Sequence, residues 1–187
     1  MKTKKFVALL LALVMLLGVA AACNGESGDD LHKEGRQDAD GKAEIALITD
    51  VGTIDDKSFN QGSWEGVVKY AIDNDKTFKY FQPTEKSDAA YINSINLAIE
   101  GGAKIIVTPG FLFEGPIHTV QDQFPDVHFI LIDGYPHAGD FVPDISDNVI
   151  GILYAEEESG YLAGYAAVHE GYRDLGFMGG MAVPPVV

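Results

Sequence analysis

The sequence predicts an α/β protein with a doubly wound parallel sheet. Short apolar runs begin near residues 45, 77, 104 and 127, and a stretch with helical spacing of apolar side chains follows each of the first three. Strands that recur in this rhythm are typical of consecutive βα units with right-handed crossovers. A chain of 187 residues with 47% hydrophobic content is also long enough for one domain with a real core.

The expected elements follow one another from residue 45 to residue 178. Ile45–Thr49 is apolar and β-branched, as in a buried parallel strand. Ser58 with Gln61 matches a capping box at the start of a helix that runs to about Asn74. The remaining elements are expected, in chain order, as strand Thr77–Phe81, helix Ser87–Glu100 with a Gly101–Gly102 C-cap, strand Lys104–Thr108, helix Leu112–Phe124, strand Val127–Ile132, strand Asn148–Leu153, helix Ala155–Tyr172 and a strand beginning at Leu175–Met178.

The end of the sequence suggests a longer protein. The last expected strand is interrupted at Gly179–Gly180 and is followed by an apolar end at Val186–Val187. A strand without its following helix leaves an unpaired edge and an uncovered face, which native proteins avoid. We therefore expect a fragment in which residues 44–153 are an N-terminal ligand-binding lobe and residues 154–187 begin a second, incomplete lobe.

The first 22 residues have the composition of a secretory signal peptide. Lys2, Lys4 and Lys5 precede the apolar run Phe6–Leu17, and small residues then lead to Cys23. This pattern resembles a bacterial lipobox, in which the cysteine becomes the acylated first residue of the mature protein, although Ala20 stands where leucine is usual. The alternative is a leftover thiol in a signal peptide that is cut elsewhere. We favour a lipid anchor, such as palmitate, because this is the only cysteine and so has no disulfide partner. Buried acyl chains, in which each methylene contributes about 0.8 kcal/mol, would hold the protein at a membrane surface.

A polar segment follows the expected signal peptide. Residues 23–43 have few apolar side chains and are expected to form a flexible tether from the lipid-anchored Cys23.

The protein is strongly acidic. Its formal charge is -15, and the charge becomes -18 without the three lysines of the first five residues, since 10 basic residues then remain against 28 acidic ones. Such a surface repels nucleic acid and anionic lipid headgroups, so we expect no nucleic-acid partner.

Candidate binding residues follow the predicted strands. Asp50 comes after the first strand, Thr108–Phe111 after the third, and Asp133–Tyr135 after the fourth. Ligands of open parallel sheets bind outside the carboxyl ends of the strands, so these residues should share one rim. Ionised Asp50 and Asp133 can each accept hydrogen bonds from two adjacent hydroxyls, as in a ribose or hexose diol. The other interpretation is that both simply end strands, as aspartate often does, but the shared rim favours binding.

Several residues near the start of the first expected helix have candidate roles. Phe59 either stacks on a flat ligand ring or packs into the core as a hydrophobic staple. Asn60 is expected to join the hydrogen bonding of the preceding loop, and Asp55–Asp56 are expected to serve the helix dipole. Further along the rim, two aromatic residues either line the cleft or pack inside: Phe111 and Tyr135.

Common motifs for catalysis and cofactors are absent from the sequence. It has no dinucleotide or phosphate loop, no serine-hydrolase elbow and no zinc-peptidase motif. The five histidines have no metal-ligand spacing, and His128, inside an apolar run, is expected to be a core residue. We therefore expect neither a cofactor nor a metal. One alternative is a secreted Mg²⁺-dependent phosphotransferase with Asp50 as nucleophile, which the lack of a second Lys/Asp constellation disfavours.

Several separate stretches carry a resemblance to a known family. Thr49–Gly66 reads TDVGTIDDKSFNQGSWEG, and further matching stretches are Gly101–Val107, Phe129–Gly134, Glu158–Gly164 and Gly176–Gly180. In order and spacing they resemble the basic-membrane-protein family of lipoproteins, which includes the bacterial purine-nucleoside receptor of an ABC importer. The resemblance covers about residues 44–187.

The resemblance implies a fold and a ligand. The fold is that of type I periplasmic binding proteins, with two α/β lobes that close on a ligand. Asp50 and Asp133 match positions that hydrogen-bond the nucleoside, chiefly its sugar, and Phe59 matches the aromatic residue that stacks on the base. We add Asn60, Gly110 and Phe111 to the same ligand-binding wall.

The implied function is transport rather than catalysis. The protein would be a solute-binding lipoprotein on the extracytoplasmic face of the cell membrane, passing purine nucleosides to an ABC importer permease. This chain would carry about half of the site, because the family's second stacking aromatic lies in the other lobe. The alternative within the family is a regulatory or signalling member that binds no nucleoside.

Overall fold

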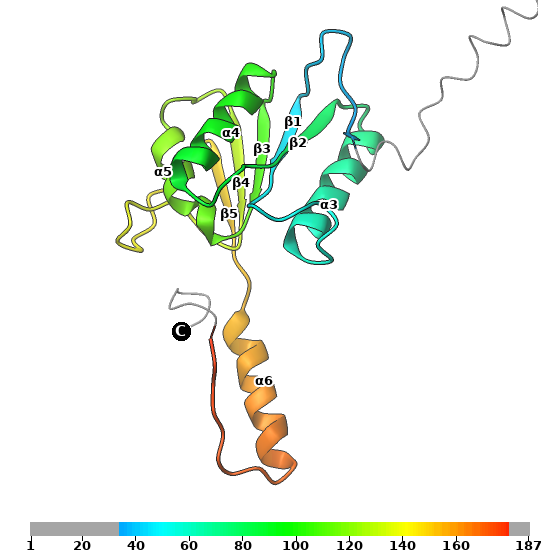
Figure 1. Cartoon of the computed structure of the whole chain (residues 1–187). Coiled ribbons are helices and arrows are strands. Elements are labelled where there is room, and N and C mark those ends of the chain that lie inside the picture. The colour runs from blue at the N-terminus through cyan, green and yellow to red at the C-terminus, as the bar shows by residue number, and fades with distance from the viewer. Residues whose placement is uncertain (1–33, 180–187) are drawn as a thin grey trace, which may run out of the picture. The chain divides into compact units, whose positions relative to one another are not determined.

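Five parallel strands in the spatial order β2-β1-β3-β4-β5 form the sheet of this protein (Figure 1). The computed structural model describes residues 34–179, so the expected signal peptide, the anchor at Cys23 and the segment after residue 179 lie outside the described residues. The strands are β1 Ile45–Ile48, β2 Phe78–Phe81, β3 Ile105–Pro109, β4 His128–Ile132 and β5 Val149–Ile152. This arrangement confirms the predicted doubly wound parallel sheet.

Helices connect the strands at nearly the predicted positions. They are α3 Phe59–Asp73, α4 Asp88–Glu100, the 3-10 turn η1 Phe111–Phe113, α5 Glu114–Val120 and α6 Glu156–His169. Ser87 caps α4 by accepting a hydrogen bond from the Ala90 N–H, and Gly102 takes the left-handed conformation after the helix, as the sequence predicts. Among residues 34–179, no helix is both long and apolar enough to cross a bilayer.

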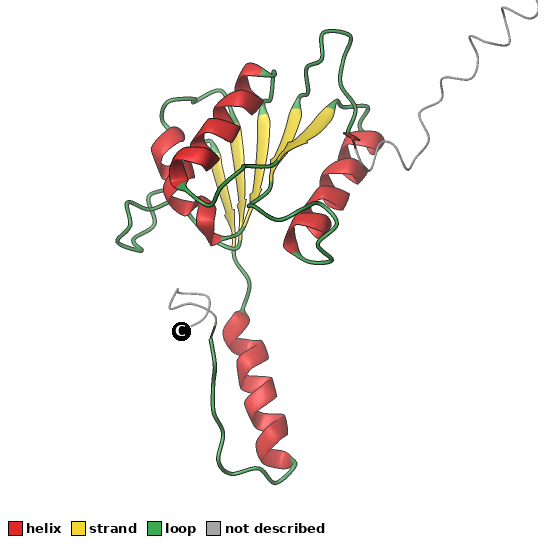
Figure 2. Ribbon diagram, in the orientation of Figure 1, coloured by secondary structure: helices red, strands yellow, loops and turns green. Residues whose placement is uncertain are grey.

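The two faces of the sheet are covered unequally. Figure 2 shows α4 and α5 on one side and α3 on the other. Ala46, Ile106 and Phe129 point toward α4 and α5 and belong to the fully buried core. The opposite face packs against α3 through β1, β2 and β3. Over β4 and β5 that face stays partly exposed, and Ile150 is 59% accessible.

The chain reverses its direction of winding between β1 and β3. From β1 it moves outward to β2, then returns past β1 to β3 and continues to β4 and β5. Such a switch point opens a crevice at the carboxyl ends of the two central strands. The fold thus places any ligand site of the sheet between the loops that follow β1 and β3.

Two sequence-based expectations about local structure need correction. The helix expected at Leu112–Phe124 is present but shorter: it begins as η1, and α5 ends at Val120, where the chain tightens into a turn in which the Gln123 N–H donates to the Val120 carbonyl. No strand forms at Leu175–Met178, whose side chains are exposed and find no partner strand among the described residues.

His128 was also misplaced by the sequence reasoning. It is exposed at the first position of β4 and is not a core residue. The reason is its position in the pleat, because His128 pairs with Ile105 and so lies on the sheet face opposite α4 and α5. An apolar run in the sequence does not reveal where the covering layer ends.

Part of the expected tether contacts the sheet. Arg36 forms an isolated antiparallel bridge with Phe78, and their backbone N–H groups donate to each other's carbonyls. The Arg36 guanidinium also donates to the carbonyls of Ala71 and Lys76, at the end of α3. Arg36 therefore connects β2 to the end of α3 through hydrogen bonds.

Candidate functional site

A pocket of about 270 Å³ opens at the carboxyl ends of β1, β3 and β4. It brings together all the residues that the sequence analysis placed in a ligand-binding wall, whereas Tyr135 does not line it. Four further residues contribute to the wall. The complete lining is Asp50, Asp56, Ser58, Phe59, Asn60, Pro109, Gly110, Phe111, Leu112 and Asp133.

The Asp50 side chain is held by the loop that follows β1. Its Oδ1 accepts hydrogen bonds from the Gly52 N–H at 2.6 Å and from the Asn60 Nδ2 at 2.8 Å. A Cβ atom at Gly52 would lie 2.7 Å from both the Asp50 Oδ1 and the Asn60 Nδ2, so a larger residue here would push one of these groups out of its hydrogen bond. Among the described residues nothing donates to the second carboxylate oxygen, which is therefore available to a ligand hydroxyl.

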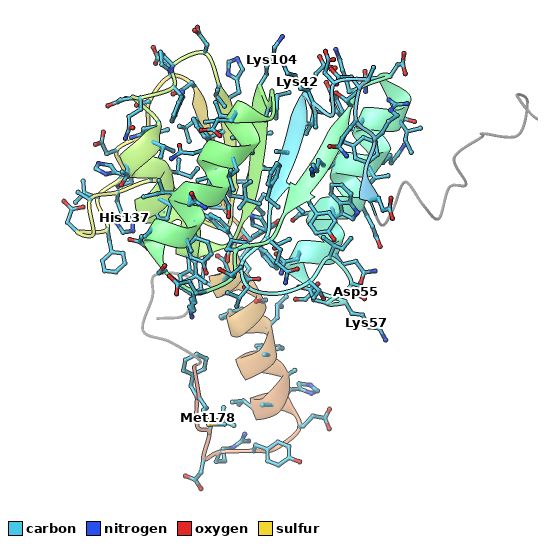
Figure 3. All side chains as sticks on the ribbon, turned by 45° about the horizontal axis from the view of Figure 1, so that its top comes forward. Lys42, Asp55, Lys57, Lys104, His137 and Met178 are labelled. Atoms are coloured by element: carbon cyan, nitrogen blue, oxygen red, sulfur yellow. The ribbon has the colours of Figure 1, made fainter. Side chains whose placement is uncertain are left out.

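Asp56, and not Ser58, caps α3. The two Asp56 carboxylate oxygens accept from the backbone N–H groups of Ser58, Asn60 and Gln61. The predicted capping box is thus wrong: the Ser58 side chain makes no cap bond, and Gln61 accepts from the Lys57 N–H. A carboxylate is the stronger acceptor, and the left-handed backbone at Lys57, in the loop seen in Figure 3, brings it over the helix end.

The same hydrogen bonds change the acidity of Asp56. Partial burial raises the pKa of its carboxyl, but the N–H groups of Gln61, Ser58 and Asn60 and the Asn60 side-chain amide outweigh that effect. The pKa of Asp56 therefore lies below its usual value of 3.8. The expectation that Asp56 stabilises the helix start is confirmed, whereas the Asp55 carboxylate accepts from the Thr53 hydroxyl instead.

Phe59 lies at the surface of the lobe and is not a core staple. Its side chain is 42% accessible, and its ring meets the Tyr154 ring edge to face with centroids 6.2 Å apart. It lines the polar pocket and also a larger apolar groove of about 660 Å³ along the α3 side of the sheet. Tyr154, just after β5, was not singled out from the sequence.

Asp133 enters the pocket from the end of β4 in a strained conformation. Its φ of 67° is left-handed, and its N–H donates to the Ile152 carbonyl at 2.7 Å. Burial, a hydrogen bond with the Glu156 carboxyl and the charges of Glu156 and Glu114 raise the pKa of Asp133. The site therefore holds a carboxyl group that ionises at a higher pH than an ordinary aspartate.

The pocket has a definite charge character. Three of its lining residues are aspartates, and none of them is a lysine or an arginine. This wall repels phosphate and carboxylate groups and favours neutral ligands that donate hydrogen bonds, such as sugar hydroxyls. Across residues 34–179, no group of three or more His, Cys, Asp or Glu side chains is placed to hold a metal ion.

A buried carboxylate next to the pocket was missed by the sequence analysis. Glu114, at the start of α5, is only 9% accessible and pairs with His137 at 3.0 Å. The sequence does contain a signal, because Glu114 interrupts the apolar run 111–117 and a buried carboxylate requires partners. The partner itself is 23 positions away and was not recognisable from spacing.

Comparison with known proteins identifies related chains. The profile of the family described as ABC transporter substrate-binding protein PnrA-like matches residues 43–186. A CD4+ T-cell-stimulating antigen of Listeria innocua is 31% identical, and the alignment covers 97% of this chain and 49% of that protein. The ABC transporter nucleoside-binding protein BmpA of Lactococcus lactis is also 31% identical, over 90% of this chain and 46% of that protein.

Solved structures support the fold. The crystal structure of a solute-binding protein of an ABC transporter system from Aeropyrum pernix K1 matches with a TM-score of 0.57 and 26% sequence identity. The match covers 75% of this chain and 39% of that one. The chain thus spans about half the length of the curated relatives that it matches.

We predict that replacing Asp56 with alanine destabilises the protein. The loss of the helix cap should lower the free energy of unfolding by roughly 0.5–2 kcal/mol in urea denaturation at neutral pH. Because the pKa of Asp56 is lowered by folding, its contribution is present above the pKa of the unfolded chain and is lost as the pH falls below 3.8. The neighbouring Asp55→Ala variant is the control and should stay within about 0.5 kcal/mol of wild type. Equal stability of the two variants would contradict the cap.

Proposed function

The chain belongs to the family of PnrA-like ABC transporter substrate-binding proteins, and from this premise we propose that the protein captures purine nucleosides for an ABC importer. The family expected from the sequence motifs is confirmed by the profile match and by the 31% identical relatives. The family is shown by these comparisons, whereas the purine nucleoside as ligand is our proposal. One relative is named a nucleoside-binding protein, and the chemistry of the pocket fits the same ligand class.

The observation that carries the proposal is the combination of acidic and aromatic groups in one wall. Asp50 and Asp133 supply carboxylate oxygens for the hydroxyls of a sugar, and Phe59 supplies an exposed ring for a flat base. A free sugar would bring no flat ring to stack on the exposed part of Phe59. A nucleotide would bring its phosphate against three aspartates, so a neutral nucleoside is the best match.

The proposed mechanism needs a second lobe. A pocket of about 270 Å³ is below the roughly 300–1,000 Å³ of typical ligand sites, and one wall leaves the other face of a base in water. We propose that residues 44–153 form the first lobe, that residues 154–187 begin the second, and that closure of the two lobes buries the nucleoside. The protein would catalyse no reaction.

The cellular setting follows from the same proposal. Cys23 would carry the lipid that holds the protein at the extracytoplasmic face of the membrane, with residues after it as a tether. Relatives from Pyrococcus are named lipoproteins, and relatives from Borreliella are named basic membrane proteins. An importer permease would then receive the nucleoside from the closed lobes.

Calorimetry tests the ligand class directly. On the longest form that the gene encodes, we expect adenosine, guanosine or inosine to bind at least about tenfold more tightly than free ribose, because base stacking contributes roughly 1–3 kcal/mol. Adenosine monophosphate should also bind more weakly than adenosine, since its phosphate faces the acidic wall. If only free sugars bind, the nucleoside proposal is wrong. Equal binding of adenosine and its monophosphate would contradict the role of the aspartates.

We predict that Phe59→Ala weakens nucleoside binding. The loss of one stacking face should cost roughly 1–3 kcal/mol, or about 5- to 150-fold in the dissociation constant. Tyr70→Ala is the matched control, because Tyr70 is also a partly exposed aromatic residue of α3 but does not line the polar pocket. It should bind nucleoside like wild type. Unchanged affinity in Phe59→Ala would remove this residue from the site.

We predict that nucleoside affinity falls in acid because of Asp133. The pKa of Asp133 is raised above 3.8, so the carboxylate that accepts two hydroxyls is lost at a higher pH than for an ordinary aspartate. Below that pKa, affinity should decrease by up to about tenfold per pH unit. The Asp133→Asn variant should bind weakly at neutral pH and lack this dependence. An affinity of the wild type that stays flat from pH 7 to well below pH 3.8, where Asp133 is protonated, would show that ionised Asp133 is not required.

A further inference from the structure

The loop after Asp133 contacts a buried pair of side chains, the Glu114 carboxylate and the His137 imidazole. Glu114 at the start of α5 and His137 in the loop after β4 are both nearly inaccessible, with 11% and 8% of their side chains exposed. Figure 3 labels His137, which lies well away from the loop of Asp55 and Lys57. Neither Glu114 nor His137 lines the polar pocket, so the pair has no direct access to a ligand there.

Both oxygens of the Glu114 carboxylate are used by this loop. Oε1 accepts from the Tyr135 N–H at 3.4 Å, and Oε2 lies 3.0 Å from the His137 Nε2. A buried carboxylate that accepts hydrogen bonds at both oxygens is fixed in orientation. The Glu114 carboxylate therefore joins the start of α5 to the loop after β4.

The backbone passes directly over the carboxylate. A Cβ atom at Gly134 would lie 2.7 Å from the Glu114 Oε1 and 3.0 Å from its Cγ, so a side chain at this position would displace the Glu114 carboxylate. Gly134 is the residue directly after Asp133. The Glu114 side chain thus packs against the backbone of the residue that follows Asp133.

The hydrogen bonds define the proton on His137. The Gly139 N–H donates to the His137 Nδ1 at 2.8 Å, so Nδ1 acts as an acceptor and carries no proton. The remaining ring proton is on Nε2 and is donated to Glu114. The imidazole therefore joins the loop at residue 139 to α5 through one defined tautomer.

We propose that Glu114 and His137 are positioning residues, which hold Asp133 in its left-handed conformation so that its carboxylate faces the ligand. This inference rests on the proposed function of Asp133 in ligand binding. A non-glycine residue at a φ of 67° is strained and persists only when its surroundings hold it there. One side is held by the hydrogen bond from the Asp133 N–H to Ile152, and the other side by the Glu114–His137 pair.

The same pair connects two walls of the pocket. Glu114 follows η1, whose first residue Phe111 lines the pocket, and the Gly110 N–H donates to the Ile132 carbonyl at 2.7 Å. Displacement of Glu114 would therefore move the Gly110–Phe111 wall relative to Asp133. A shift of this kind loosens a site without unfolding the lobe.

His137→Leu tests the proposal, and the chain offers a matched control. His118, on α5, pairs with Asp144 in the connection between β4 and β5 at 3.0 Å, and neither residue hydrogen-bonds to the Glu114 carboxylate. We expect His137→Leu to weaken adenosine binding by about tenfold, the value of one hydrogen bond to a charged group, and His118→Leu to stay within about twofold of wild type. His137→Gln, which can still donate to Glu114, should restore most of the affinity.

Hydrogen exchange on the ligand-free protein separates positioning from general destabilisation. The Tyr135 and Asp133 amides should exchange at least about tenfold faster in His137→Leu, while amides in the middle of α4 keep their wild-type rates. Uniformly faster exchange, or equal affinity loss in His137→Leu and His137→Gln, would show a merely structural role. If His137→Leu does not fold, Glu114→Gln, which keeps the volume but loses one of the two bonds, should give the same local pattern.

The two proposals fail in different ways. If wild-type protein binds no nucleoside, the proposed function is wrong, but the exchange rates of Asp133 and Tyr135 still decide whether the Glu114–His137 pair holds the loop. If wild type binds nucleoside and His137→Leu binds equally well with unchanged exchange, the positioning proposal is overturned and the proposed function stands.

Discussion

The hydrogen bonds of the Asn60 side chain connect the parts on which the site depends. Its buried amide nitrogen donates to Asp50 at the end of β1 and to Asp56 above the first turn of α3. Two carboxylates would repel each other across this short loop, and a shared donor offsets that repulsion. Because the same helix turn begins with Phe59, the amide fixes the aspartate and the aromatic ring relative to each other.

Much of the fold could be predicted from the sequence, because its determinants are local. Apolar runs such as Ile45–Ile48 and helical spacing such as that of α4 are properties of neighbouring residues, and the parallel order then follows from short right-handed connections. The rim residues could be anticipated for the same reason. Three features depend instead on tertiary distances, which spacing along the chain does not encode. They are the capping of α3 by Asp56, the exposure of His128 and the pairing of Glu114 with His137.

Electrostatics explains why the wall suits a neutral ligand and not merely a polar one. Burial and the neighbouring Glu156 and Glu114 carboxyls already oppose the ionisation of Asp133, which is why its pKa is raised. An anionic ligand would add further charge of the same sign and increase the cost. A ligand hydroxyl has the opposite effect, since it donates to the carboxylate and replaces the water that burial removes. The raised pKa and the choice of a hydrogen-bond donor as ligand are therefore two consequences of one environment.

The uncovered side of the sheet bears on how a ligand would be enclosed. Phe59 and Tyr154 both line the apolar groove beside α3, and Tyr154 lies two residues after the end of β5. Phe59 is 42% accessible, which leaves part of its ring surface open to the stacking that we propose for the base. In the proposed complex one lobe would exclude water from only one side of the base, and the hydrogen bonds to Asp50 and Asp133 would still compete with bulk solvent. Closure of a second lobe over the same wall would remove that competition, which is why the proposed mechanism includes lobe closure.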